Sequence, residues 1–241
     1  MPLTVTPVAC LSDNYAWLLR APDGRLAVCD PGEAGPVIAA AEAEGGRIDT
    51  ILLTHHHGDH VAGVAELVKR HGSKVVGAAA DAHRLPPLDL AVTPGETFDL
   101  FGVPVEVLAS DGHTRGHIAF HLPACAILLC GDTLFSLGCG RLLEGTAEQM
   151  FHSLAALAAL PPETLVCCGH EYSESNARFA LTIEPDNAAL QARAAEIARQ
   201  RAEGLPSLPT TIGEECDANP FLRAKDVATL ARIRTAKDNF R

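Results

Sequence analysis

Short apolar runs, each bounded by turn-forming residues, recur over the first two thirds of the chain. Runs of this length that are rich in Val, Ile and Leu are typical of β-strands. They predict strands over Leu3–Val8, Ala16–Arg20, Leu26–Cys29, Thr50–Leu53, Lys74–Val76, Val103–Leu108, Ile118–Leu122, Ala126–Leu129 and Leu165–Cys168.

Helical spacing of apolar residues appears between these runs and dominates the last seventy residues. The predicted helices are Ala34–Glu44, Val61–His71, Ala147–Leu160, Glu174–Ile183, Asn187–Glu203 and Lys225–Ala236. Thr146 and Gln149 stand at the spacing of a capping box before the third of these helices. Strands interspersed with helices indicate an α/β fold. We therefore expect an α/β domain over residues 1–170 and a small helical domain over residues 171–241.

The size and composition of the chain fit a globular protein that does not cross a membrane. Its 241 residues suit one large domain with a small appendage, and the longest apolar run, Ala124–Cys130, is far shorter than the ~20 residues of a membrane helix. The N-terminus lacks the basic and apolar regions of a secretory signal. Without such a signal, the eight cysteines are best interpreted as reduced thiols, and we expect a cytoplasmic protein.

The net charge of −11 is unevenly distributed along the chain. From Arg223 onward there are six basic and two acidic residues, a charge of +4, so the rest of the chain carries −15. An acidic body disfavours nucleic-acid binding, which depends on Lys and Arg at phosphates. The basic tail suits a small anionic ligand, although a solvated helix face would have the same composition.

The segment with the clearest chemistry is His55-His56-His57-Gly58-Asp59-His60, which lies between a predicted strand and a predicted helix. His55 and His57 are two residues apart on an extended chain, so they point the same way while His56 points elsewhere. Asp59 alone would be interpreted as a helix N-cap. Four ligand types within six residues instead indicate a metal site, because imidazole and carboxylate together suit zinc, iron or manganese.

Three further ligand-type residues follow apolar runs, each directly after a glycine: His113, Asp132 and His170. Glycine allows a tight turn and a close approach of the backbone to a site. Taken singly, such an Asp is more often a turn residue and such a His a hydrogen-bonded one. The interpretation as ligands rests on the whole set.

This set, His-x-His-x-Asp-His followed by Gly-His, Gly-Asp and Gly-His, resembles the pattern of the metallo-β-lactamase superfamily. The resemblance implies a four-layer αββα sandwich with the metals at one edge, between the sheets. Within the superfamily the chain is most similar to the glyoxalase II (hydroxyacylglutathione hydrolase) family. The segments that carry this similarity are Ser12-Asp13-Asn14-Tyr15, Gly138-Cys139-Gly140-Arg141, Glu144-Gly145-Thr146, Cys168-Gly169-His170-Glu171-Tyr172, Asn219-Pro220-Phe221 and Arg234-x-x-Lys237.

The resemblance implies two divalent ions, most often zinc, with iron or manganese as alternatives. Carried over by position, it assigns His55, His57 and His113 to one ion and Asp59, His60 and His170 to the other. Asp132 would bridge the two ions. Asp59 and Asp132 would act in catalysis, while His117 would lie outside the ligand set.

The resemblance also implies the reaction, which is hydrolysis of S-D-lactoylglutathione to a 2-hydroxy acid and glutathione by a bimetal-activated hydroxide. This is the second step of methylglyoxal detoxification. The implied glutathione contacts are Arg141 and, in a helical glutathione-binding domain over residues 171–241, Tyr172, Arg234 and Lys237. Leu143 departs from the family, since some relatives carry an aromatic residue there. We expect a monomer that binds neither nucleic acid nor membrane.

Four other functions compete with this interpretation. A glutathione persulfide dioxygenase would use a single iron and would not need the second metal site. A nucleic-acid-processing nuclease is disfavoured by the acidic body, and a β-lactam hydrolase would normally be exported and lack the C-terminal domain. A non-catalytic metal-binding protein gives no reason for Arg234 and Lys237.

Overall fold

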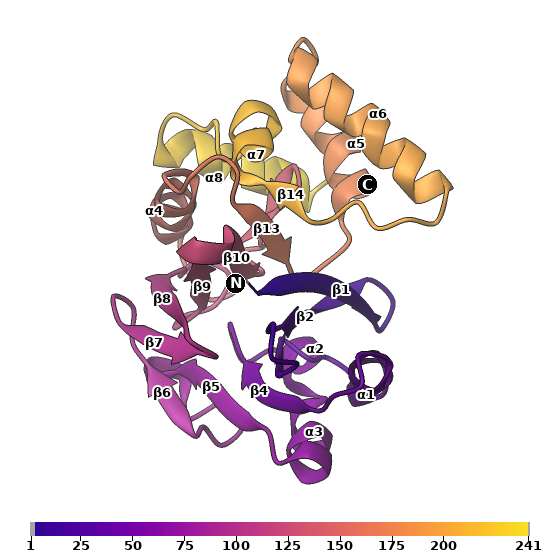
Figure 1. Cartoon of the computed structure of the whole chain (residues 1–241). Helices are drawn as coiled ribbons and strands as arrows, with labels where there is room; N and C mark the ends of the chain where they lie inside the picture. The colour runs from indigo at the N-terminus through magenta and orange to yellow at the C-terminus, as the bar shows by residue number, and fades with distance from the viewer. Residues whose placement is uncertain (1–2, 241) are drawn as a thin grey trace. The chain divides into compact units, whose positions relative to one another are not determined.

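The protein is described here by a computed structural model that covers residues 3–240 (Figure 1). The terminal residues 1–2 and 241, which the predicted domain ranges include, lie outside the described residues. The chain divides into two compact units. Unit 1 comprises the residues up to Ala109 with Gly116–Gly131, and unit 2 comprises Ser110–Arg115 with the residues from Asp132 onward. The predicted domain boundary at residue 170 remains a prediction.

Unit 1 contains a six-stranded sheet in which the strands lie in chain order. Its elements are β1 (Thr4–Cys10), β2 (Asn14–Arg20), β3 (Leu26–Cys29), β4 (Ile48–Leu52), β5 (Lys74–Ala78) and β6 (Leu90–Val92). The first three strands pair antiparallel, and β3 to β6 pair parallel. Because the carboxyl ends of parallel strands meet at one edge, the residues that follow β3 and β4 lie side by side.

The rest of unit 1 is an antiparallel array of β7 (Thr97–Leu100), β8 (Val103–Ala109), β9 (Ile118–Leu122) and β10 (Ile127–Gly131). Every residue of β9 and β10 is buried. Strands that are covered on both faces lose the alternation of apolar and polar residues, which explains their mostly apolar sequence. The backbone N–H of Ile118 donates to the carbonyl of Thr54, so β9 begins beside the loop that follows β4.

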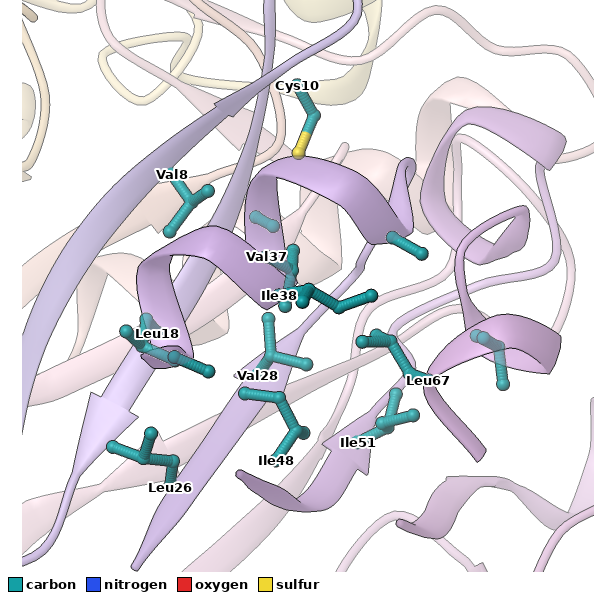
Figure 2. Close-up of a cluster of buried hydrophobic side chains, with 14 of the residues drawn as sticks. Val8, Cys10, Leu18, Leu26, Val28, Val37, Ile38, Ile48, Ile51 and Leu67 are labelled. Atoms are coloured by element: carbon teal, nitrogen blue, oxygen red, sulfur yellow. The ribbon is translucent and has the colours of Figure 1, made fainter. Parts of the chain in front are cut away.

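Helices α1 (Ala34–Ala43) and α3 (Val64–His71) cover the six-stranded sheet. Figure 2 shows Val37 and Ile38 of α1 packed near Val28 and Ile51 of the sheet. Leu67 joins the same cluster from α3 and is completely buried. This apolar interface holds the loops at the carboxyl ends of β3 and β4 on a rigid base.

The helix predicted over Val61–His71 is present but begins three residues later than predicted, because two helices meet here. The first is α2 (Gly58–Val61), and α3 begins at Val64. Gly63 separates them, and its N–H donates to the carbonyl of Pro31. A Cβ at Gly63 would lie 2.7 Å from that oxygen and 2.7 Å from the Ala34 nitrogen, so the chain must carry glycine where it passes the start of α1.

Unit 2 is mainly helical. Its elements are β11 (Leu134–Phe135), β12 (Gly138–Cys139), α4 (Ala147–Ala158), β13 (Leu165–Cys168), α5 (Ser173–Ile183), α6 (Ala188–Ala202), β14 (Thr210–Thr211), α7 (Ile212–Ala218) and α8 (Val227–Asp238). Strands β11 and β12 form a hairpin, and β13 pairs with β14. Helices α5 and α6 run side by side (Figure 1).

The capping box predicted at Thr146 and Gln149 is confirmed at the start of α4. A second capping box, at Thr211 and Glu214, begins α7, a helix that the apolar pattern did not predict because it is only seven residues long. The α/β class with helices after residue 170 is confirmed. None of the eight cysteines forms a disulfide, and none of the helices described is long and apolar enough to cross a membrane.

The packing of α3 gives a test of the core in unit 1. Replacing the buried Leu67 with Ala should lower the free energy of unfolding by about 2–5 kcal/mol, because it leaves a cavity under α3. Val68→Ala, on the exposed side of the same helix, should change it by less than about 0.5 kcal/mol. Equal losses in urea titrations of the two variants would contradict the assigned packing.

Candidate metal centre

Unit 1 supplies the loop from Leu53 to His60 at the carboxyl end of β4. The ring of His55 lies 4.7 Å from that of His57 and 4.2 Å from that of His60, centroid to centroid. His56 turns away, and its Nδ1 lies 3.0 Å from Oδ2 of Asp81. His56 therefore points away from His55 and His57, as the sequence predicted. Asp59 and His60 fall in α2, at the helix start where they were expected.

Asp30, which follows β3, holds this loop in place. Its Oδ1 accepts a hydrogen bond from the Thr54 backbone N–H at 2.9 Å, and its Oδ2 accepts from the Thr54 hydroxyl at 2.6 Å. The same Oδ2 lies 3.0 Å from Nδ1 of His60. Asp30 is buried and has a φ of 51°, a left-handed conformation that Asp tolerates better than most residues.

These hydrogen bonds determine which nitrogen of each imidazole carries the proton. The Thr54 hydroxyl gives its one hydrogen to Asp30, so it must accept from Nδ1 of His55, 3.0 Å away. The carboxylate of Asp30 likewise accepts from Nδ1 of His60. Both rings therefore carry their lone pair on Nε2, which is the arrangement of metal-binding histidines supported by a hydrogen bond on the far nitrogen.

Asp59 is fixed from the other side by Asn14, the first residue of β2. The Asn14 amide donates to Oδ2 of Asp59 at 3.0 Å and to its backbone carbonyl at 3.2 Å. Oδ2 of Asp59 lies 3.7 Å from Nε2 of His60, and its side chain is 40% exposed. The carboxylate is thus oriented and still accessible to solvent or a ligand.

Unit 2 supplies a second group of donors. Oδ2 of Asp132 lies 3.5 Å from Nε2 of His113 and 3.3 Å from Nε2 of His170. Nδ1 of His113 donates to the carbonyl of Arg141 at 2.8 Å, so its lone pair is also on Nε2. Two donors on one tetrahedral ion, each at ~2.1 Å, lie roughly 3.4 Å apart. The three residues fit metal ligands, with one oxygen of Asp132 placed between two imidazoles.

Glycines allow the chain to close around this second group. A Cβ on Gly140 would collide with the carbonyl of Asp132 and lie 3.2 Å from Cβ of His113. Gly112 has a φ of 141° and passes against Met150 of α4. A larger residue at Gly140 would displace Asp132, and one at Gly112, next to His113, would displace Met150, which gives each glycine a specific role.

Tyr172 and His170 form a parallel stack, with ring centroids 4.5 Å apart and planes inclined by 4°. The edge of Phe135 packs against both rings. Tyr172 is partly exposed, so one part of it supports His170 while another is open to a ligand. Leu143, which replaces an aromatic residue of some relatives, is exposed.

Lys237 of α8 lies among arginines. Partial burial, followed by the charges of Arg234, Arg178 and Arg141, lowers its pKa to about 8. Its ammonium donates to the carbonyl of Ser175 at 2.9 Å and to the Ser175 hydroxyl at 3.0 Å. An ammonium has three hydrogens, so one donor remains for an anion.

Arg234 has a different environment from Lys237. Its guanidinium is buried, donates through Nη1 to the carbonyl of Cys139 at 2.7 Å and through Nη2 to Asp238 at 2.8 Å. Arg141 is 71% exposed, with Nε 3.8 Å from Oδ1 of Asp238. Three of the predicted glutathione contacts are therefore open to a ligand, namely Arg141, Tyr172 and Lys237. Arg234 instead binds a backbone carbonyl.

Sequence reasoning missed the residues that support the ligands. Asp30 could have been found, because it ends an apolar strand in the same way as the predicted ligands do. Thr54 and Arg178 carry no comparable signal, since each is an ordinary polar residue in its element. His117 was expected outside the ligand set, and its ring stacks on that of His55 at 4.7 Å.

Comparison with known proteins agrees with this chemistry. The sequence model of the Metallo-beta-lactamase superfamily matches residues 12–170, and that of the Hydroxyacylglutathione hydrolase C-terminus matches residues 171–240. The hydroxyacylglutathione hydrolase of Ruegeria pomeroyi is 53% identical, with 100% of both chains covered. That of Acidiphilium cryptum is 56% identical and covers 98% of this chain and 97% of its own.

Solved structures give the same fold. ETHE1 from Myxococcus xanthus superposes with a TM-score of 0.71 at 24% identity, covering 98% of this chain and 90% of its own. TTHA1623, solved in a di-iron-bound form, gives 0.63 at 30% identity, covering 92% and 99%. The chain belongs to the metallo-β-lactamase superfamily and, within it, to the hydroxyacylglutathione hydrolase family.

The support given by Asp30 can be tested on metal affinity. Asp30→Asn should weaken metal binding by about 10–100-fold, because an amide has only one acceptor oxygen and cannot accept from the Thr54 N–H as well as from the Thr54 hydroxyl and His60. Competition with a chromogenic chelator measures the affinity. Asp49→Asn, a change on β4 where Asp49 accepts from the Leu26 N–H, is the matched control and should leave it unchanged.

Proposed function

We propose that the chain is a metal-dependent hydrolase that cleaves the thioester of S-(2-hydroxyacyl)glutathione, with S-D-lactoylglutathione as the expected substrate. The products are a 2-hydroxy acid and glutathione. The observation that carries the chemistry is the position of Asp132 Oδ2 between the Nε2 atoms of His113 and His170. Relatives named hydroxyacylglutathione hydrolase, about half identical over the full chain, support the substrate.

We propose two ions per chain, most often zinc, with iron or manganese possible. His55, His57 and His113 would hold one, and Asp59, His60 and His170 the other, with Asp132 shared. The donor set supports this, since imidazole with carboxylate suits these metals. The di-iron form of the related TTHA1623 also supports two ions. When bound, such a pair supplies a water of near-neutral pKa and a Lewis acid for a carbonyl oxygen.

The residues of the chain would orient the reactants. Asp59 is held through Oδ2 by Asn14 and is still partly exposed, so it can accept a hydrogen bond from an attacking water. Asp132 would contribute through its position between the ligand histidines. No general acid is needed for the leaving group, because a thiol has a pKa of ~8.5 and departs as thiolate more readily than an amine.

The substrate would be recognised by its carboxylates. Arg141, Tyr172 and Lys237 present two cations and a phenol to a ligand, and Arg178 adds positive potential beside them. Arg234 belongs to the same proposed binding set, although its guanidinium is buried. Glutathione carries two carboxylates and one ammonium, so a cationic surface of this kind is complementary to it.

We further propose that the enzyme is a cytoplasmic monomer that binds no nucleic acid. Eight cysteines, none of them in a disulfide, support a reducing compartment. The net charge of −11 supports the absence of nucleic-acid binding. We place the functional boundary between the catalytic and glutathione-binding domains at residues 170 and 171.

The assay that tests the function is thiol release from S-D-lactoylglutathione by metal-replete protein. Thiol should appear in proportion to enzyme and should cease after chelation. The competing function, a glutathione persulfide dioxygenase with a single iron, predicts oxygen consumption with glutathione persulfide and no thiol release from the thioester. The match of the C-terminal domain model favours the hydrolase.

The depressed pKa of Lys237 predicts a pH dependence of substrate binding. Lys237 is charged below its pKa of about 8, so KM should rise as the pH increases through that value and the cation is lost. Lys237→Arg keeps the charge throughout this range, and its KM should stay constant. Parallel pH profiles for the two proteins would exclude a contact between Lys237 and the substrate, since ionisation of the substrate affects both equally.

A further inference from the structure

The β11–β12 hairpin lies between Asp132 and Arg141 and is too small to be stable by itself. Only two residue pairs join its strands, and a two-stranded hairpin alone is marginally stable in water. Every residue from 131 to 140 is buried, and Leu137 at the turn has a φ of 56°. A buried backbone must find hydrogen-bond partners. Here most of the partners come from side chains of the C-terminal helices.

Four side chains from these helices bind the hairpin backbone. The amide of Asn219 donates to the carbonyls of Phe135 at 3.1 Å and Gly138 at 3.0 Å. The remaining contacts are Asn176 Nδ2 to the Ser136 carbonyl at 3.0 Å, Arg234 Nη1 to the Cys139 carbonyl at 2.7 Å, and the Leu137 N–H to Oε2 of Glu215 at 2.8 Å.

Glu215 of α7 is the centre of this group. It is completely buried, and besides the Leu137 N–H it accepts from the Asn219 amide at 2.9 Å and the Thr210 hydroxyl at 2.9 Å. Burial raises the pKa of its carboxyl. Burying a carboxylate is unfavourable even when it is hydrogen-bonded, and an apolar residue of similar volume is often as stable. Its presence therefore indicates a need for a defined hairpin position.

The two ends of the hairpin carry parts of the metal centre. Asp132 precedes β11, and after β12 the Gly140 N–H donates to the Thr133 carbonyl at 3.1 Å. Gly140 passes directly against the Asp132 backbone, and the next carbonyl, that of Arg141, accepts from His113. A shift of the hairpin would therefore move both Asp132 and His113.

We infer that Glu215 and Asn219 are positioning residues, which hold the 134–139 hairpin so that Asp132 and His113 keep their distances in the metal centre. This inference rests on the proposed function for its effect on turnover. It also gives a role to the segment Asn219-Pro220-Phe221, which has no part in the proposed reaction. Asn219 ends α7, and its Oδ1 accepts from the Phe221 N–H at 3.0 Å, which orients the amide toward the hairpin.

Near-isosteric variants of the full-length, metal-replete protein test this inference. Asn219→Asp keeps the shape and the acceptor for Phe221 but removes both donors to the hairpin carbonyls. Glu215→Ala removes the acceptor for Leu137, whereas Glu215→Gln keeps an oxygen there. Thr211→Ala is the matched control, because it weakens α7 at its cap without touching the hairpin.

Three quantities are measured: hydrogen–deuterium exchange of residues 133–141, metal equivalents retained after dialysis, and kcat. In Asn219→Asp and Glu215→Ala, exchange should be at least ~10-fold faster, metal retention lower, and kcat reduced by about 10–100-fold. Glu215→Gln should keep most of all three. Thr211→Ala should lower the melting temperature and leave metal content and kcat unchanged.

The inference is overturned if Asn219→Asp loses thermal stability as Thr211→Ala does but keeps its metal and kcat. If Glu215→Ala does not fold, Asn219→Asp and Glu215→Gln still decide between the outcomes. Failure of the proposed function would be distinguishable. The wild-type protein would then release no thiol from S-D-lactoylglutathione, while exchange and metal retention would still report on the hairpin.

Discussion

The structure depends on hydrogen bonds that the Nδ1 atoms of three histidines donate, because the rest of the molecule must supply the acceptors. His55 donates to Thr54, His60 to Asp30 and His113 to the carbonyl of Arg141. Each bond sets the tautomer and leaves the lone pair on Nε2, as in histidines that bind a metal. Several imidazoles can bind the same metal centre only if each ring is held in one orientation. The parallel strands β3 and β4 hold the first two rings, and the β11–β12 hairpin supports the third.

This requirement explains why small residues and unusual backbone conformations gather around the donors. Asp30 reaches Thr54 and His60 only from a left-handed conformation, and Gly140 is needed where the chain crosses Asp132. The C-terminal helices have two functions in this account. We propose that they present Lys237 to an anionic substrate and that they hold the hairpin in place through Glu215 and Asn219.

The sequence predicts the fold class and the donor residues because both depend on local pattern. Apolar strands that end in His, Asp or Gly-His are visible without a structure, and so is the capping box before α4. The break between α2 and α3 was not predictable, because it arises from the contact of Gly63 with a loop thirty residues earlier. The contacts of Asn219 and Glu215 with the hairpin could not be predicted either, since their partners lie about eighty residues away in the chain. For Arg234 the family motif predicts a substrate contact, whereas in the structure its guanidinium donates to a backbone carbonyl.

The central claim is that the two proposed metal ions share Asp132. A crystal structure of the metal-replete protein, with ions located by anomalous scattering, tests it most directly. We predict two ions per chain, both in contact with Asp132, with His55, His57 and His113 on one and Asp59, His60 and His170 on the other. A single ion, or two ions of which only one contacts Asp132, would contradict the account.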